Sequence, residues 1–391
     1  MKLRTLLSDF SFSALSAGFI AVLIGFASAM AIVFQAAQAA GASQEMIVSW
    51  VWALGIGMGV GCIGLSLYYK RPIIIAWSTP GAALLVTSLN GVAIEHAIGI
   101  FIFVAILTLL LGLSGWFDRL TKRIPLPLAA AMLAGILLQF GLHIFTAMQS
   151  SPVLVGAMGL VYLIAKSYLA RYAIMLVLAT GFAIAYGSEL LQFSALNVEL
   201  AVPVWVSPQF DLAQLIGIGI PLFIVTMSSQ NIPGVAILKS SGYQQQPISP
   251  IISWTGGINL ILAPLGGFAF NLAAITAAIC TSAEAHENPD KRYVAGVACG
   301  IFNIIAGIGA VTVVSLFAAF PQALVAALAG LALLGTIGSS LLTATSQTSY
   351  RDSAIITFLI SASGISFLGL ASAFWGIVIG MLAHSISKRE K

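Results

Sequence analysis

The residues best suited to bind a small ligand lie where a helix is predicted to begin inside an apolar segment. Residues 72–77 are rich in isoleucine and strand-like, and Ser78 then leads into a helical pattern that runs to residue 89. Proline at an early helix position favours such a start. A helix N-terminus exposes unpaired N–H groups and carries about half a positive charge, so it binds anions without a basic side chain. The residues placed to do this are Thr79, Pro80 and Gly81.

A second stretch repeats this pattern in the other half of the chain. Pro264 and the pair at 266–267 interrupt an apolar segment, residues 268–271 are strand-like, and a helical pattern follows from 272 to 280. Two half-helices that face each other would form an anion site between them. The second half-helix contributes the candidates Asn271, Leu272 and Ala273.

Three neighbouring polar side chains lie in another apolar segment, just before Pro233 and Gly234. An unpaired amide in such a segment costs on the order of 1 to 3 kcal/mol, so each amide needs a partner. A hydrogen bond to another helix and contact with a substrate are both compatible with this position. The three candidates are Ser229, Gln230 and Asn231.

Aromatic residues flank both predicted breaks. Trp77, Phe268 and Phe270 are placed to hold an aromatic ring by stacking or edge contacts. In a chain that is 10% aromatic, such neighbours also arise from packing alone. Phe270 is included among the candidate substrate-binding residues.

The sequence shows no set of residues for catalysis or for holding a cofactor. No Ser/His/Asp order and no zinc motif is visible, and the three cysteines lack metal-ligand spacing. Residues 59–64 spell GxGxxG, but no strand precedes them and they lie within an apolar segment, which indicates helix packing rather than a dinucleotide site. We therefore expect no enzyme, no cofactor and no metal.

Composition places these candidate residues in a membrane protein. Of 391 residues, 60% are hydrophobic and only 7% are charged, whereas a soluble domain carries roughly 25% charged residues. The basic residues are scattered singly or in pairs, so they form no face for nucleic acid. The apolar run that follows Lys2 and Arg4 is too long for a signal peptide, and we interpret it as a retained first span.

The spacing of the charged residues predicts fourteen membrane crossings. A crossing helix needs about 20 apolar residues; six uncharged gaps fit one crossing each, and four longer gaps fit two each. Alternation from the N-terminus then puts all 16 Lys and Arg residues on one side, while the opposite loops carry only acidic charge. The positive-inside rule makes that side cytoplasmic, and it includes both termini.

The longest polar stretch, residues 189–211, separates residues 1–188 from residues 212–391 and is predicted to be a periplasmic linker. Each part contains seven predicted spans. Because seven is odd, the second part enters the membrane upside down, which is the inverted-repeat architecture of secondary transporters. The predicted fold class is an all-α polytopic membrane protein in which spans 3 and 10 are each a short strand plus a half-helix.

Four motifs resemble those of one family. They are GFASAM at 25–30, STPGA at 78–82, SSQNIPG at 228–234, and GGFAFN at 266–271 running on to TSAEAH at 281–286. With them the chain resembles the bacterial benzoate/proton symporters over nearly its full length, and more distantly the nucleobase transporters and anion exchangers. The resemblance implies a core domain of spans 1–4 and 8–11 and a gate domain of spans 5–7 and 12–14.

The resemblance implies a secondary transporter of the bacterial inner membrane that imports a small aromatic carboxylate, such as benzoate, with a proton. The nucleobase relatives typically have an acidic residue or histidine in span 8, where this chain has residues 229–231, and this departure argues against a nucleobase. An exchanger or uniporter of another small anion, and an anion channel, stay open as alternatives. The partners expected are the anion, the proton, the lipid bilayer and, in a homodimer, a second copy.

The sequence offers few candidate residues to carry a coupled proton, because no ionisable side chain is predicted at the middle of the membrane. Glu284 ends the second half-helix and lies in a cluster with His286, Glu287 and Asp290, so it is the candidate proton carrier. The same cluster is also typical of a solvated loop whose charges pair with neighbouring basic residues. The proton travelling on the substrate itself is the remaining alternative.

Overall fold

The structure is a computed structural model, and it describes residues 9–117, 125–169, 173–191, 199–243, 248–273, 275–281, 285–313, 321–365 and 372–387. Helices dominate this part of the chain, and its one sheet is a pair of short strands. Large apolar side chains are exposed on several helices, including Leu113 at 70%, Ile261 at 73% and Leu342 at 72%. Apolar side chains exposed on so many helices indicate surfaces that meet lipid or another protein. The protein is a multi-pass membrane protein, and these faces meet lipid.

The first half of the described chain forms seven helices and one strand. Ser11 and Ser43 begin the first two helices, because their hydroxyls accept the N–H groups of Ala14 and Met46. The elements are α2 (Phe12–Ala39), α3 (Gln44–Tyr69), β1 (Ile75–Trp77), α4 (Thr79–Ser88), α5 (Ile94–Ser114), α7 (Leu126–Ser150), α8 (Pro152–Tyr168) and α9 (Ala173–Gly187).

The second half begins with a helix that contains two π-helical turns and runs through α10 (Leu212–Gln214), η3 (Leu215–Gly219), α11 (Ile220–Thr226), η4 (Met227–Asn231) and α12 (Ile232–Ser240). It continues with α13 (Ile248–Leu262), η5 (Ala263–Leu265), β2 (Phe270–Leu272), α14 (Ile275–Thr281) and η6 (Pro289–Lys291). The last elements are α15 (Tyr293–Ile308), α17 (Gln322–Thr345), η7 (Thr348–Tyr350), α18 (Arg351–Ser363) and α19 (Ser372–Ser387).

The two predicted breaks meet in space. Strands β1 and β2 pair antiparallel, with Ala76 opposite Asn271. Each strand is followed by a short helix, α4 after β1 and α14 after β2. The prediction of a strand plus a half-helix at both places is therefore confirmed.

The second break begins later than predicted. Gly266 and Ala269 have φ angles of 93° and 45°, so residues 266–269 turn before the strand starts at Phe270. The helix after it is described only from Ile275, whereas the sequence pattern placed its start at 272. Positive φ at an alanine carries no sequence signal, which is why the pattern missed this turn.

Glycines set the spacing between α3 and α15. A Cβ atom on Gly55 would lie 2.6 Å from the Cα atom of Gly307, and one on Gly300 would lie 2.7 Å from the carbonyl oxygen of Gly59. The two helices approach this closely because neither has a side chain at these positions. The interpretation of the GxGxxG stretch as a helix-packing stripe is confirmed.

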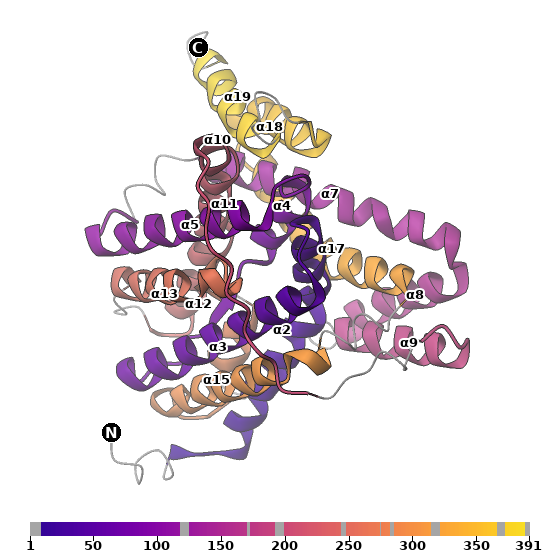
Figure 1. The fold of residues 1–391 in the computed structure, drawn as a ribbon, viewed down its shortest axis with the longest axis vertical. Coiled ribbons are helices and arrows are strands. Elements are labelled where there is room, and N and C mark those ends of the chain that lie inside the picture. The colour runs from indigo at the N-terminus through magenta and orange to yellow at the C-terminus, as the bar shows by residue number, and fades with distance from the viewer. Residues whose placement is uncertain are drawn as a thin grey trace.

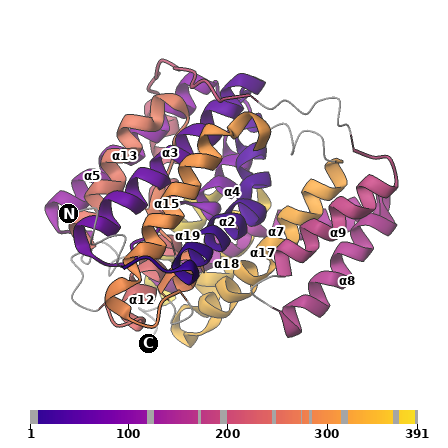
Figure 2. The same ribbon diagram turned by 90° about the horizontal axis from the view of Figure 1, so that it is seen from below.

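The helices fall into two sets on opposite sides of the molecule. Figures 1 and 2 both show α5 and α13 at the edge opposite α8 and α9. Helix α3 packs on α15 and α5 packs on α13, while α7 packs on α17 and on α18. The named division into core and gate domains stays a prediction.

Residues 199–211 cross the ends of several helices as an extended strap. The Val204 N–H donates to the Ser49 hydroxyl at 2.9 Å, and that hydroxyl donates to the Leu265 carbonyl at 2.9 Å. The N–H of Val206 bonds the Pro264 carbonyl at 2.9 Å. The strap therefore joins the start of α3 to the end of α13, on the side predicted to be periplasmic.

Helices lie in each of the fourteen segments where a crossing was predicted. Six of the described helices are long and apolar enough to cross a membrane: Gln44–Tyr69, Ile94–Ser114, Ala130–Ser150, Leu212–Asn231, Ile248–Leu265 and Pro289–Ile308. The others are shorter apolar helices or the broken segments. The count of fourteen and the inverted repeat stay predictions.

Candidate functional site

The first break presents a capped helix N-terminus. The Ser78 hydroxyl accepts the N–H of Gly81 at 3.0 Å, and the Ser78 carbonyl accepts the N–H of Ala82 at 2.7 Å. Pro80 has no N–H. The Thr79 N–H is therefore the first-turn donor of α4 that no hydrogen bond within the described residues uses. A ligand anion at this helix end would meet that donor and the positive end of the helix dipole.

At the second break, the backbone N–H groups are already hydrogen-bonded to other parts of the protein. The N–H of Leu272 donates to the Asn231 Oδ1 atom at 3.0 Å, and the N–H of Ala273 donates to the Ile74 carbonyl at 2.9 Å. These two donors are therefore not available to an anion in this conformation. The two breaks, which look alike in the sequence, differ in what they offer a ligand.

Asn271 supplies an acceptor rather than a donor. Its side chain is fully buried, and its Nδ2 atom donates to the Ala269 carbonyl at 2.9 Å. The same carbonyl accepts the N–H of Ser78 at 3.1 Å, so the Asn271 amide lies next to the residue that caps α4. Its Oδ1 atom is buried and has no hydrogen-bond partner in the described residues. A buried acceptor without a donor is costly, and a ligand that donates a hydrogen bond would satisfy it.

The three polar residues of η4 divide into two roles. Asn231 is fully buried and bonds β2, as described above, so its role in the structure is to hold the strand. The side chains of Ser229 and Gln230 are half-buried and make no hydrogen bond within the described residues. A π-helical turn widens the helix and is frequent at functional sites. Residues 229 and 230 are therefore the part of this motif that is free to meet a ligand.

Helix α7 lies against this site. It packs on α4 and on η4, and η4 in turn packs on β2. Helix α7 corresponds to predicted span 5, which belongs to the predicted gate domain. Predicted substrate residues from both halves of the chain therefore lie beside a predicted gate helix. A site between two groups of helices is the usual place for a ligand in an α-helical transporter.

The aromatic candidates serve packing in this structure. The Phe270 ring is directed at Gly57 of α3, where an added Cβ atom would collide with it, and Phe270 is 1% exposed. Trp77 contacts Phe26 edge to face at 5.1 Å. Phe268 lies 5.8 Å from Trp50, centroid to centroid. Of these rings, the Phe26–Trp77 pair joins α2 to the strand that leads into α4.

Sequence reasoning missed Thr226, the last residue of α11, directly before η4. It is 1% exposed, and its Oγ1 atom has no hydrogen-bond partner in the described residues. A threonine two residues before the SSQN motif is the signal that was available. No local sequence pattern indicates the π-helical turn itself.

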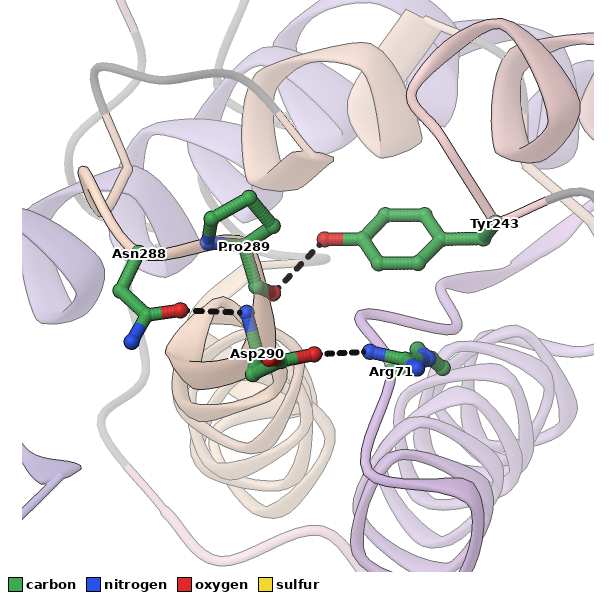
Figure 3. A network of polar contacts seen from close by, with 5 residues as sticks. All are labelled: Arg71, Tyr243, Asn288, Pro289 and Asp290. Carbon is green, nitrogen blue, oxygen red and sulfur yellow. Dashed lines mark hydrogen bonds and ion pairs between the residues drawn. The ribbon is translucent and has the colours of Figure 1, made fainter.

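The charged cluster on the predicted cytoplasmic side forms paired contacts (Figure 3). Arg71 donates to Asp290 at 2.6 Å, and the Tyr243 hydroxyl donates to the Pro289 carbonyl at 2.9 Å. Arg292 donates from Nη1 to the carbonyl of Thr281, the last residue of α14, at 2.8 Å. No group of three metal-ligating side chains occurs in the part of the chain that is described. Glu284, the candidate proton carrier, lies outside the described residues.

A second set of contacts in this cluster involves Asp9, which precedes α2. Its carboxylate accepts a hydrogen bond from the Tyr293 hydroxyl at 2.8 Å and lies 3.2 Å from the Lys291 ammonium. The hydrogen bond from Tyr293 is the largest cause, and Lys291 adds to it, so the pKa of Asp9 is lowered below its ordinary value of 3.8. These contacts join the N-terminal segment to the start of α15.

The fold has counterparts among solved membrane transport proteins. The fold is similar to the transmembrane domain of the cyanobacterial bicarbonate transporter BicA, with a TM-score of 0.60 at 14% identity over 97% of this chain and 98% of that one. It is also similar to the murine anion transporter Slc26a9 in the inward-facing state, with a TM-score of 0.62 at 14% identity over 97% of this chain and 68% of that one.

Sequence comparison gives the family. The sequence model described as "Benzoate membrane transport protein" matches residues 8–386. The chain is 44% identical over 389 residues to the benzoate membrane transport protein of Acinetobacter baylyi, covering 100% of this chain and 98% of that protein. It is also 44% identical to the inner membrane protein YdcO of Escherichia coli, covering 95% of each. The chain belongs to the benzoate membrane transport protein family, which confirms the resemblance seen in the motifs.

Proposed function

We propose that the protein is a secondary transporter that carries a small aromatic carboxylate, such as benzoate, across the bacterial inner membrane. The observation that carries this proposal is the pairing of β1 with β2, which brings two broken spans together beside an available helix N-terminus. The substrate class is supported by the name of the Acinetobacter baylyi relative, and the location by that of the Escherichia coli relative.

In this proposal the substrate carboxyl group lies at the start of α4. It accepts from the Thr79 N–H and meets the positive end of the helix dipole. Ser229 and Gln230 contribute hydrogen bonds from η4, because their side chains have no other partner in the described residues. The second break completes the site from the far side, with Asn271 as acceptor and Leu272 and Ala273 as backbone around it.

The mechanism that we propose is alternating access. The substrate site lies against α7, so movement of the predicted core spans past α7 and the other predicted gate helices would expose the site to each side in turn. A secondary transporter with inverted repeats works in this way. The proposed topology has fourteen spans with both termini cytoplasmic, and the proposed assembly is a homodimer.

Proton symport belongs to the proposal, and the structure favours one of its two forms. No carboxylate, histidine or basic side chain occurs in β1, α4, η4, β2 or α14. A protonated substrate would supply the O–H donor that the Asn271 Oδ1 atom lacks. A proton that travels on the substrate therefore fits the site better than one carried by Glu284.

Uptake of labelled benzoate into proteoliposomes, with and without an inward proton gradient, tests the function. We expect accumulation above the external concentration only with the gradient. Uptake that equilibrates regardless of the gradient would show a uniporter, and conductance far above transporter turnover would show a channel. Absence of benzoate uptake would reject the substrate class.

One observation favours a second candidate substrate. BicA, which shares the fold, is named as a bicarbonate transporter. Unlabelled bicarbonate should therefore be added as a competitor in the same assay. Competition by bicarbonate as strong as that by benzoate would indicate a transporter of small anions without an aromatic requirement.

A further inference from the structure

The edge of β1 that faces away from β2 is hydrogen-bonded to side chains of α3 rather than to another strand. The Ser66 hydroxyl accepts the N–H of Ile73 at 3.2 Å and donates to the carbonyl of the same residue at 3.1 Å. One turn earlier in α3, the Cys62 sulfur accepts the N–H of Ile75 at 3.1 Å, and its S–H donates to the Ile75 carbonyl at 3.5 Å. We call these two side chains and their four hydrogen bonds the Cys62–Ser66 ladder.

The dimensions of a helix and a strand explain why one helix can pair with a strand in this way. Residues four apart in an α-helix are separated by about 6.0 Å along its axis, and residues two apart in a strand are separated by about 6.6 Å. Helix α3 and β1 run in opposite directions, because Ser66 meets residue 73 and Cys62 meets residue 75. Two side chains one turn apart on α3 therefore reach every second residue of the strand.

Glycines let α3 and α15 lie close to the ladder. A Cβ atom on Gly61 would lie 3.0 Å from the Cγ1 atom of Ile75, and one on Gly296 of α15 would collide with the Ser66 hydroxyl. Both side chains of the ladder are 0% exposed. A backbone N–H or carbonyl that lost its partner here would stay unpaired in an apolar interior, which is unfavourable.

The other edge of β1 is bonded to the second break. The Ile74 carbonyl accepts the N–H of Ala273, and the Ser78 N–H donates to the Ala269 carbonyl. Alternate residues of this segment thus bond α3 on one side and the β2 segment on the other. The segment is held on both edges as far as Ser78, the residue that caps α4.

We propose that Cys62 and Ser66 are positioning residues for the anion-binding end of α4. They act through β1: the ladder fixes where the strand lies along α3, and the strand leads directly into Ser78 and Thr79. Without one of these side chains, the start of α4 would shift relative to the residues of η4 that complete the site. The effect on transport rests on the proposed function, whereas the positions of β1 and α4 do not.

The transport test compares two fully buried cysteines. Cys62→Ala removes the thiol that bonds Ile75, whereas Cys280→Ala in α14 removes an equally buried thiol whose hydrogen bonds, to the carbonyls of Ala17 and Ala295, are 4.0 Å long. Both changes delete the same sulfur atom from the interior, so the two variants should lose similar stability. We expect the KM for benzoate to rise, by up to about tenfold and with an unchanged maximal rate, only in Cys62→Ala.

Cys62→Ser is the conservative variant. A serine hydroxyl can also accept an N–H and donate to a carbonyl, so the KM should return toward the wild-type value. A KM for Cys62→Ala equal to that for Cys280→Ala would overturn the proposal. A KM for Cys62→Ser as high as that for Cys62→Ala would overturn it too, because the size of the side chain and not its hydrogen bonds would then matter.

Hydrogen exchange tests the ladder without any substrate. The exchange of backbone amides between residues 73 and 82 is followed by mass spectrometry on the purified full-length protein. Cys62→Ala and Ser66→Ala should speed exchange in this segment by up to about tenfold, whereas Cys280→Ala and Cys62→Ser should leave it close to that of the wild type. Unchanged exchange in both Cys62→Ala and Ser66→Ala would overturn the proposal. If the wild type takes up no benzoate, the proposed function fails, and exchange alone decides whether the ladder positions β1 and α4.

Discussion

The two broken spans have the same order of elements, a strand followed by a short helix, but they leave different hydrogen-bonding groups free. At the first break, Ser78 caps a ten-residue helix and leaves the Thr79 N–H unused within the described residues. At the second break, the N–H groups of Leu272 and Ala273 already donate, to the Asn231 side chain and to the Ile74 carbonyl. The first break thus offers a positive helix end, and the second offers a fixed strand and one unpaired acceptor.

This difference teaches that two breaks placed alike in the two halves of a chain need not supply the same chemistry. The site needs only one helix end, since two opposed donors would favour the carboxylate anion over a protonated acid, whose O–H needs an acceptor. An acceptor at Asn271 beside a donor at Thr79 matches the two oxygens of a carboxylic acid. The following experiments test this division of roles.

The largest effect is expected at Asn231. Asn231→Leu leaves the buried N–H of Leu272 without a partner, at a cost of about 1–3 kcal/mol, and releases β2 from η4. We expect a lower unfolding temperature in detergent and loss of benzoate uptake. Unfolding is followed by a thermal shift assay on the purified protein.

Gln230→Leu is the matched control for that experiment, because it changes the neighbouring amide, which bonds nothing in the described residues. Its unfolding temperature should stay close to that of the wild type while the KM for uptake rises. If instead Gln230→Leu were the destabilising change, the roles assigned to the two amides would be exchanged.

The next effect is expected at the cap of the first break. Ser78→Ala removes the hydroxyl that accepts the Gly81 N–H, and loss of such a cap costs about 0.5–2 kcal/mol. The start of α4 should loosen, so KM for benzoate should rise together with a modest loss of stability. Ser228→Ala is the control, since that hydroxyl bonds the Ile224 carbonyl within its own helix. Equal KM values for the two variants would argue against α4 as the anion-binding end.

The sequence predicted the positions of both breaks because the signals are local: proline and glycine pairs, a Ser-Thr-Pro-Gly start and strand-like residues. It also predicted the glycine stripe of α3, since small residues in an apolar segment have a direct packing meaning. It did not predict which donors are already used. The bond from Leu272 to Asn231 joins residues 41 positions apart, and the bond from Ala273 to Ile74 joins the two halves of the chain. Local patterns carry no information on such contacts.

Asn271 tests which form of the substrate binds. Asn271→Leu removes a costly unpaired acceptor together with the Nδ2 hydrogen bond to the Ala269 carbonyl, which keeps the N–H of Ser78 as a donor. These two changes oppose each other, so stability should change little, while loss of one hydrogen bond to the substrate should raise its Kd up to about tenfold. Benzamide is an informative second ligand, because its N–H group donates at every pH. We expect benzamide to bind the wild type with no pH dependence and benzoate to bind more weakly as pH rises above its pKa. Benzoate affinity that is flat across this range would show that the anion binds and that the proton takes another route.

The smallest effect is expected outside the membrane, where the N-terminal segment meets the start of α15. Asp9 accepts from Tyr293 and lies beside Lys291, and these contacts lower its pKa below 3.8. Because the pKa is lower in the folded protein than in the unfolded chain, ionised Asp9 contributes stability that is fully present above about pH 5 and is lost as pH falls through the folded pKa. The unfolding temperature of Asp9→Asn should therefore be lower than that of the wild type at neutral pH, and the two should converge toward pH 3.

Glu287→Gln is the control, because it changes an exposed carboxylate of the same cluster that has no hydrogen bond to the described residues. Its unfolding temperature should follow that of the wild type at every pH. A difference for Asp9→Asn that persists unchanged at low pH would show that the contact acts through packing of the N-terminal segment and not through its charge, and the connection between that segment and α15 would then be steric rather than electrostatic.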